Sequence, residues 1–193
     1  SDQASSAAGL GRALASGDGQ VVGRELGAPW FKGQPKEVRA DVYRALARQG
    51  APGRDLRRSL AAELAEAGRL ARQGPIEFRA HRRVGGVLRE IDIVGKDEIV
   101  ECKRTRDLKS ARKVLGRDST ASDVDLMGTV GGDRRRTLAI YVDEGQPDGI
   151  PDAVVRNAAQ LERRQPGTRI DLVFPAGIRM RYDGGSATFV EVS

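Results

Sequence analysis

The chain has 193 residues, a formal net charge of +6 and a sequence pI near 9.9. This length allows one domain with an extension or at most two small domains, and the basic balance favours a polyanionic partner. A single cysteine and a single histidine exclude an internal disulfide framework, a cysteine-rich zinc site and a histidine-cluster metal site, and they argue against a Ser-His-Asp mechanism. No apolar run approaches the ~20 residues of a transmembrane helix, and no secretory signal is visible.

The N-terminal part of the chain is predicted to be a lead-in followed by two helices. Residues 1–34 are rich in Ser, Ala and Gly with little periodicity, which predicts a linker-like segment before a domain over residues 35–193. Apolar spacing predicts helices over residues 35–49 and 55–73, with a turn at Ala51-Pro52-Gly53. Glu63 lies on the apolar face of the second helix, where a carboxylate is either functional or a partner for an arginine.

Strand-like patterns follow the second helix. Residues 76–84 alternate between apolar and polar side chains, which predicts a strand. Ile91–Val94 and Ile99–Cys102 are rich in β-branched residues, and Gly95-Lys96-Asp97 between them is typical of a turn, so this segment is predicted to be a β-hairpin.

The rest of the chain alternates between helical and strand-like patterns. The expected helices cover residues 108–115 and 152–164, and the expected strands cover residues 137–142, 169–174, 178–182 and 187–192. Residues 118–132 are rich in Ser, Thr, Asp and Gly, which predicts a loop with one helical turn around Val124–Met127. Helices between strands require crossovers, so this order predicts an α/β fold with a mixed central sheet flanked by helices.

Charged residues interrupt the most sheet-like part of the chain. Side chains alternate along a strand, so Glu101 and Lys103 share one face of the second hairpin strand, while Asp92 lies on the first. Such charges are costly in a sheet unless they are paired or bind a metal. Together with Glu63, the carboxylates form a hard-oxygen set that suits Mg²⁺ or Mn²⁺, with Zn²⁺ as a further option. Lys103 is placed to orient a water molecule or to stabilise developing charge.

These residues resemble a known motif. Asp92, an eight-residue gap and Glu101-Cys102-Lys103 resemble the D-x(n)-(D/E)-x-K signature of the PD-(D/E)XK, or restriction-endonuclease-like, nucleases. The run E-I-D-I-V-G-K-D-E-I-V-E-C-K-R is similar to the core of the Holliday-junction-resolvase-like members, in which a helix glutamate precedes a glycine and a strand, as Glu63 and Gly74 do here. The resemblance covers about residues 55–115. It implies a restriction-endonuclease-like fold and metal-dependent cleavage of phosphodiester bonds by Asp92, Glu101 and Lys103, with Glu63 as a further metal ligand.

Some positions depart from the pattern of that superfamily. Ile91 stands where the motif has a proline, Arg89 replaces the usual small residue before Glu90, and Cys102 replaces a more usual aliphatic residue. Alternation turns Cys102 away from the face of Glu101, so it is expected to be a small buried hydrophobic residue.

The chain is also similar in organisation to the toxin domains at the ends of bacterial polymorphic and contact-dependent inhibition toxins. That similarity implies an effector delivered into the cytoplasm of a target bacterial cell and blocked by a cognate, acidic immunity protein. The substrate would be nucleic acid, with DNA slightly favoured over tRNA because few aromatic residues are present to stack single-stranded bases. The residues expected to contact phosphates are Arg104, Arg106, Lys109, Arg112, Lys113, Arg134, Arg135 and Arg136.

Two alternatives remain at the level of the sequence. The chain could be a cytoplasmic, resolvase-like endonuclease of DNA repair, or a non-catalytic nucleic-acid-binding module of the same fold. Intact Asp92, Glu101 and Lys103 argue against the second alternative, because an inactivated copy usually loses one of the motif residues.

Overall fold

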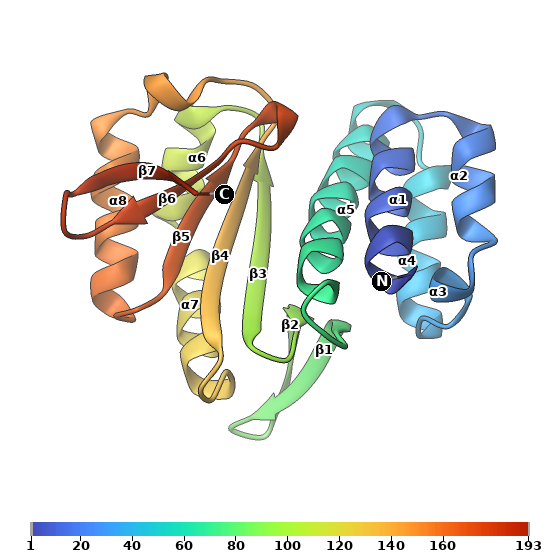
Figure 1. Cartoon of the computed structure of the whole chain (residues 1–193), viewed down its shortest axis with the longest axis horizontal. Coiled ribbons are helices and arrows are strands. Elements are labelled where there is room, and N and C mark those ends of the chain that lie inside the picture. The colour runs from blue at the N-terminus through green and yellow to red at the C-terminus, as the bar shows by residue number, and fades with distance from the viewer. Residues whose placement is uncertain (1, 193) are drawn as a thin grey trace. The chain divides into compact units, whose positions relative to one another are not determined.

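The computed structural model describes residues 2–192. The chain divides into two compact units, Ser1–Ala80 with Asp92–Lys96, and His81–Ile91 with Asp97–Ser193 (Figure 1). The α-helices are α1 (Asp2–Ser16), α2 (Gly19–Leu26), α3 (Pro29–Lys32), α4 (Lys36–Ala47), α5 (Gly50–Ala71), α6 (Leu108–Leu115), α7 (Asp118–Val130) and α8 (Asp152–Arg164). The strands are β1 (Glu77–Val84), β2 (Val87–Val94), β3 (Glu98–Thr105), β4 (Arg135–Val142), β5 (Arg169–Val173), β6 (Arg179–Asp183) and β7 (Thr188–Val192). Within residues 2–192, no helix combines the length and the apolar character that a membrane crossing needs.

The strands form one seven-stranded sheet in the order β1-β2-β3-β4-β5-β6-β7. The β3–β4 and β4–β5 pairs are parallel, whereas the β5–β6 and β6–β7 pairs are antiparallel. Helices α6 and α8 supply the crossovers that parallel neighbours require. This topology confirms the predicted α/β class and the mixed sheet flanked by helices.

The first unit corrects the expectation for residues 1–34. They are not linker-like: α1, α2 and α3 occupy this segment, and Leu10 and Leu14 of α1 are fully buried. The small residues that suggested a linker let α1 approach α5 closely. A Cβ on Gly68 of α5 would lie 3.0 Å from the Ala8 Cβ, and a Cβ on Gly11 would lie 3.1 Å from the Leu64 Cβ. Small side chains thus form a helix–helix interface here.

Helix α5 starts earlier than its sequence suggests. Gly50 opens the helix, and the expected turn at Ala51-Pro52-Gly53 is its first turn, where a proline costs no hydrogen bond. The carbonyl groups at the end of α4 accept hydrogen bonds from a side chain of α5. Arg57 Nη1 donates to the carbonyl oxygens of Ala45 and Arg48, each at 3.1 Å.

In the second unit, α6, α7 and α8 pack against one face of the sheet (Figure 1). The core on this face joins β-branched and leucine side chains of the strands to apolar positions of the helices. It includes Ile99, Leu138, Ile140, Ile170, Leu172, Leu115, Val124, Met127, Val154, Ala158 and Leu161. The register sets Glu101 beside Leu138 and Lys103 beside Ile140, so the motif residues of β3 are held in the central part of the sheet.

Helix α7 corrects the expected loop over residues 118–132. Thr120, Val124 and Met127 are buried at helical spacing, and the Thr120 hydroxyl donates to the Val114 carbonyl at 2.6 Å. Polar composition suggested a loop, but these inward positions fit a helix that packs on the sheet. The helix matters for function because it carries Asp123.

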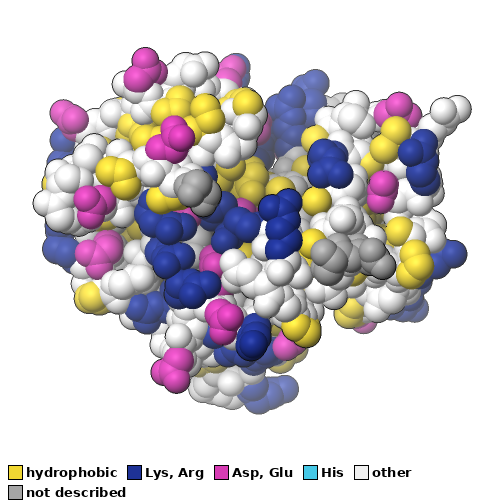
Figure 2. Space-filling model, in the orientation of Figure 1, with side chains coloured by type: hydrophobic (Ala, Val, Ile, Leu, Met, Phe, Trp, Pro, Cys, Tyr) yellow, Lys and Arg dark blue, Asp and Glu magenta, His cyan; other side chains and the backbone are white. Residues whose placement is uncertain are grey.

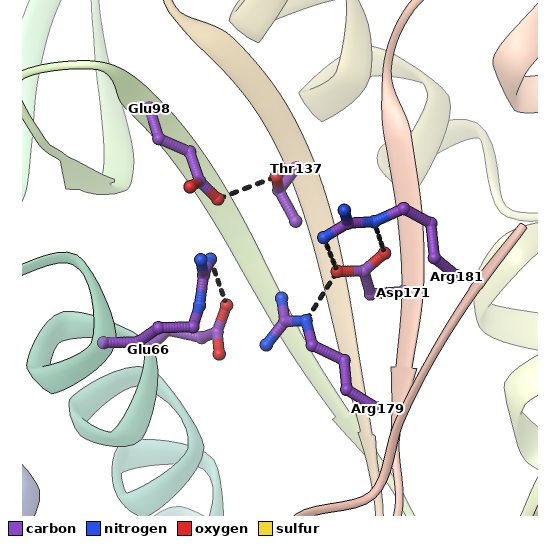
Figure 3. A network of polar contacts seen from close by, with 7 residues as sticks. Glu66, Glu98, Thr137, Asp171, Arg179 and Arg181 are labelled. Carbon is purple, nitrogen blue, oxygen red and sulfur yellow. Dashed lines mark hydrogen bonds and ion pairs between the residues drawn. The ribbon is translucent and has the colours of Figure 1, made fainter. Parts of the chain in front are cut away.

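The opposite face of the sheet in the second unit carries a buried charge network (Figure 3). Asp171 is 0% exposed and accepts hydrogen bonds from Arg179 Nε at 2.6 Å, Arg181 Nε at 2.8 Å and Arg181 Nη2 at 2.9 Å. On the same face, Glu98 Oε2 accepts from the Thr137 hydroxyl at 2.8 Å. Burial, followed by the nearby guanidinium of Arg181, lowers the pKa of Arg169 from its ordinary value.

Candidate active site

The motif residues of β3 lie as their alternation requires. The strand runs over Glu98–Thr105, longer than the expected Ile99–Cys102, and Glu101 is buried on the same face as Lys103. Lys103 is partly buried, and its Nζ donates to Asp123 Oδ2 at 2.5 Å. A charge-assisted bond in a partly buried place fixes the ammonium more firmly than an exposed pair would.

Asp123 is the residue that sequence reasoning missed. It lies on α7, in the segment expected to be a loop, so no pattern in the sequence placed its side chain near β3. The apolar spacing of Thr120, Val124 and Met127 was the signal that could have identified the helix. Once α7 packs on the sheet, Asp123 becomes the carboxylate that orients Lys103.

Asp92 and Glu63 belong to the first unit. Asp92 is half-buried on β2, which covers Val87–Val94, and its neighbours Ile91 and Ile93 are fully buried. This burial pattern confirms the expected strand, in which the charged side chain of Asp92 alternates with buried side chains. The strand that carries Asp92 is adjacent to β3 in the strand order, as the hairpin prediction expected.

Glu63 is buried on α5 and is engaged by an arginine. Arg79 Nε donates to its Oε1 at 3.2 Å and Arg79 Nη2 to its Oε2 at 3.0 Å, while Arg79 Nη1 also donates to Asp41. The sequence left open whether Glu63 is functional or paired, and within the first unit it is paired. Glu66, further along α5, is also buried and accepts from Arg69 Nη2 at 3.0 Å.

Arg79→Ala is expected to destabilise the protein by about 2–3 kcal/mol, because it removes the guanidinium that bonds both Glu63 and Asp41 in a largely buried place. Arg79→Gly is expected to cost roughly 1 kcal/mol less, because Arg79 has a φ of 54°, which glycine adopts without a Cβ penalty. Urea unfolding of the two variants shows which of them has the larger free energy of unfolding. A glycine variant no more stable than the alanine variant would contradict this account.

The motif implies a metal ion held by carboxylates. Among residues 2–192, no group of three or more His, Cys, Asp or Glu side chains is arranged to hold a metal ion. Mg²⁺, however, is commonly held by one or two carboxylates together with substrate phosphates and water. Asp92 and Glu101 supply hard oxygen donors of that kind, whereas both oxygens of Glu63 accept hydrogen bonds from Arg79. Glu63 is therefore the member of the expected set that fits a magnesium ion least.

The basic residues expected to contact phosphates divide into two groups. Lys109, Arg112 and Lys113 are exposed on α6, and this part of the expected basic surface is available to a polyanion. Arg106 is exposed and lies 3.4 Å from Glu144. Arg104 is largely buried and is paired with Asp143 through its Nε at 3.0 Å.

The arginine triplet at the start of β4 does not form one surface. Arg134 Nη1 donates to the Gly131 carbonyl at 3.4 Å, and Arg136 Nη2 donates to the Pro166 carbonyl at 2.5 Å. Arg135 and Arg136 are consecutive residues of β4, so their side chains leave opposite faces of the sheet. Figure 2 shows further Lys and Arg side chains gathered over the sheet of the second unit.

Helix α6 follows the motif directly and is capped by Asp107. The Asp107 carboxylate accepts from the Ser110 backbone N–H at 2.8 Å, and this bond holds the pKa of Asp107 below its ordinary value of 3.8. A carboxyl group with a lowered pKa in the folded state stabilises the fold fully above its unfolded-state pKa. That stabilisation is lost as the pH falls through the lowered folded-state pKa.

Asp107→Ala is therefore expected to lower the free energy of unfolding at neutral pH and to lose less, relative to wild type, under strongly acidic conditions below pH 3.8. Urea unfolding of both proteins at the two pH values measures this difference. An equal difference at both values would show that the ionised cap does not stabilise α6.

Comparison with known proteins gives no relative for this arrangement. No protein-family model matches the chain, and neither a curated protein nor a solved structure matches it. The class that the fold defines is an α/β protein with a mixed seven-stranded sheet.

Proposed function

We propose that the protein is a metal-dependent nuclease with a restriction-endonuclease-like core made of α5, β1, β2, β3, α6 and β4. The observation that supports this most is on β3, where Glu101 and Lys103 share one face and Asp123 holds the Lys103 ammonium at 2.5 Å. Asp92 lies on the preceding strand, in agreement with the D…ExK pattern. The order helix, three strands, helix and parallel strand also agrees with such a core.

In this proposal the side chains have distinct tasks. By the motif, Asp92 and Glu101 would each supply a carboxylate for the metal, and a bound Mg²⁺ would supply activation of water and neutralisation of charge on the phosphate. Lys103 donates hydrogen bonds to the attacking water or to a phosphate oxygen. The bond to Asp123 restricts the rotamers of Lys103, so the ammonium is oriented before the substrate binds. Lys109, Arg112 and Lys113 of α6 attract the phosphate backbone.

The biological setting is proposed from the same resemblance. The protein acts as an effector in the cytoplasm of a target bacterial cell, and an acidic immunity protein blocks its basic site. DNA is the favoured substrate and tRNA the second. The net charge of +6 suits either polymer, and the low aromatic content, 4%, gives few platforms for stacking unpaired bases.

The experiment is a cleavage assay with the purified chain on plasmid DNA and on total tRNA, side by side, with Mg²⁺, with Mn²⁺ and with EDTA. We expect cleavage of at least one polymer with either metal and none with EDTA. Intact plasmid and intact tRNA under all conditions would contradict the proposal. Faster loss of plasmid than of tRNA would support the preference for DNA.

A further inference from the structure

The tip of the β1–β2 hairpin exposes two large aliphatic side chains. Val87 is 60% exposed and Leu88 is 57% exposed, more than any other large hydrophobic residue in the described chain. Gly85 and Gly86 between the strands have φ values of 56° and 80°, which is the backbone of a tight hairpin turn. Two adjacent, exposed aliphatic residues at a hairpin turn offer a contact surface rather than a part of the core.

Arginines surround this apolar tip. Arg82 and Arg83 precede the turn and Arg89 follows it, so a short ribbon combines three guanidinium groups with Val87 and Leu88. Arg83 Nη1 donates to the Gly86 carbonyl at 3.0 Å and lies across the turn. Figure 2 shows Lys and Arg side chains, with some Asp and Glu side chains among them, at the lower end of the view, where Figure 1 draws the hairpin.

The hairpin tip is linked to the proposed catalytic lysine through one helix. Arg89 Nη2 lies 3.4 Å from Ser122 Oγ on α7. The next residue of α7, Asp123, holds Lys103. The tip therefore contacts the same helix that positions Lys103.

We propose that the β1–β2 tip is a groove-binding ribbon for double-helical DNA, a proposal that rests on the nuclease function above. A two-stranded β-ribbon fits the major groove. Val87 and Leu88 are consecutive, so their side chains leave opposite faces of the ribbon, and the tip enters the groove end-on to bring both to thymine methyl groups and base edges. The flanking arginines bind the phosphates on either side. The local charge favours this polyanionic occupant: Glu90, which lies 3.6 Å from His81 Nε2, is the one carboxylate within His81–Ile91.

The first test is binding of a short fluorescent DNA duplex in EDTA, measured by anisotropy for the wild type and for the Val87→Ser/Leu88→Ser double variant. We expect about a tenfold weaker affinity with an unchanged salt dependence. The matched control, Ile178→Ser/Val190→Ser, replaces residues that are 36% and 40% exposed elsewhere on the second unit and should bind as the wild type does. Equal affinity of the wild type and the tip variant, or no duplex binding by the wild type, would overturn the proposal.

The second test separates the arginines from the aliphatic residues. Arg83→Ala/Arg89→Ala is expected to reduce the slope of log affinity against log salt by about two, whereas the exposed pair Arg156→Ala/Arg163→Ala on α8 leaves it unchanged. This variant also serves if the tip variant does not fold. Anionic phospholipid vesicles are the counter-probe. Binding to vesicles but not to duplex, lost in the tip variant, would overturn the proposal in favour of a membrane surface.

The two proposals can fail separately. A wild type that binds the duplex through the tip but does not cut it with Mg²⁺ would overturn the nuclease function and leave the ribbon supported. A wild type that cuts the duplex, with a tip variant that binds and cuts it equally well, would overturn the ribbon alone.

Discussion

Lys103→Ala is expected to reduce Mg²⁺-dependent cleavage of nucleic acid by about 10²–10³-fold, the cost of losing one preorganised donor to developing charge. The ammonium is held by Asp123 at 2.5 Å on the same face of β3 as Glu101, so its removal takes away an oriented donor rather than a mobile surface charge. The loss should appear mainly in kcat, because the interaction strengthens as charge develops on the phosphate.

Two further variants sharpen this experiment. Lys96→Ala removes an exposed lysine between β2 and β3 and should leave the rate unchanged. Asp123→Asn keeps the shape of the side chain but removes the charge that positions Lys103, and we expect a smaller loss in kcat with KM little changed. A Lys103→Ala protein that is folded and cuts at the wild-type rate would show that Lys103 is not catalytic.

The second large effect is on stability. Asp171→Ala is expected to destabilise the protein by about 3 kcal/mol or more, because Arg179 and Arg181 both donate to a carboxylate that is 0% exposed. Removing the anion leaves its cationic donors in a largely buried place beside Arg169, whose pKa is already lowered by burial and by Arg181. Urea unfolding at neutral pH measures the change.

The control for Asp171 is an exposed carboxylate on the neighbouring strand. Asp183 is exposed at the end of β6, and Asp183→Ala should change the free energy of unfolding far less. If Asp171→Ala unfolds at the same denaturant concentration as the wild type, then the network of Asp171, Arg179 and Arg181 does not stabilise the sheet.

Hydrophobic periodicity predicted the helices and strands whose apolar side chains are large. The strands β3, β4 and β5 and the helices α6 and α8 were predicted within a few residues, because Ile, Val and Leu at a period of two or near four leave a clear pattern. Helix α1 was not predicted, because its contacts with α5 rely on residues such as Ala8 and Gly11. Small side chains that allow close packing have the same composition as a flexible linker, so composition alone cannot separate the two.

The sequence likewise predicts only part of the candidate site. The alternation of Glu101 and Lys103 follows from strand geometry and could be predicted from their spacing. The pairings between distant segments could not be predicted from spacing. Asp123 lies 20 residues after Lys103, and Arg79 lies 16 residues after Glu63. The charged face around Asp171 could not be predicted from the sequence either, because its buried carboxylate binds arginines that follow it by eight and ten residues.

The most direct test of the nuclease account compares plasmid cleavage with Mg²⁺ by Asp92→Asn and Glu101→Gln with cleavage by two matched controls. Asp97→Asn and Glu191→Gln make the same chemical changes at exposed positions. The account predicts that the controls cut as the wild type does, whereas the two motif variants, folded and binding DNA, lose cleavage by about 10²-fold or more. Equal cleavage by the motif variants and the controls would contradict it.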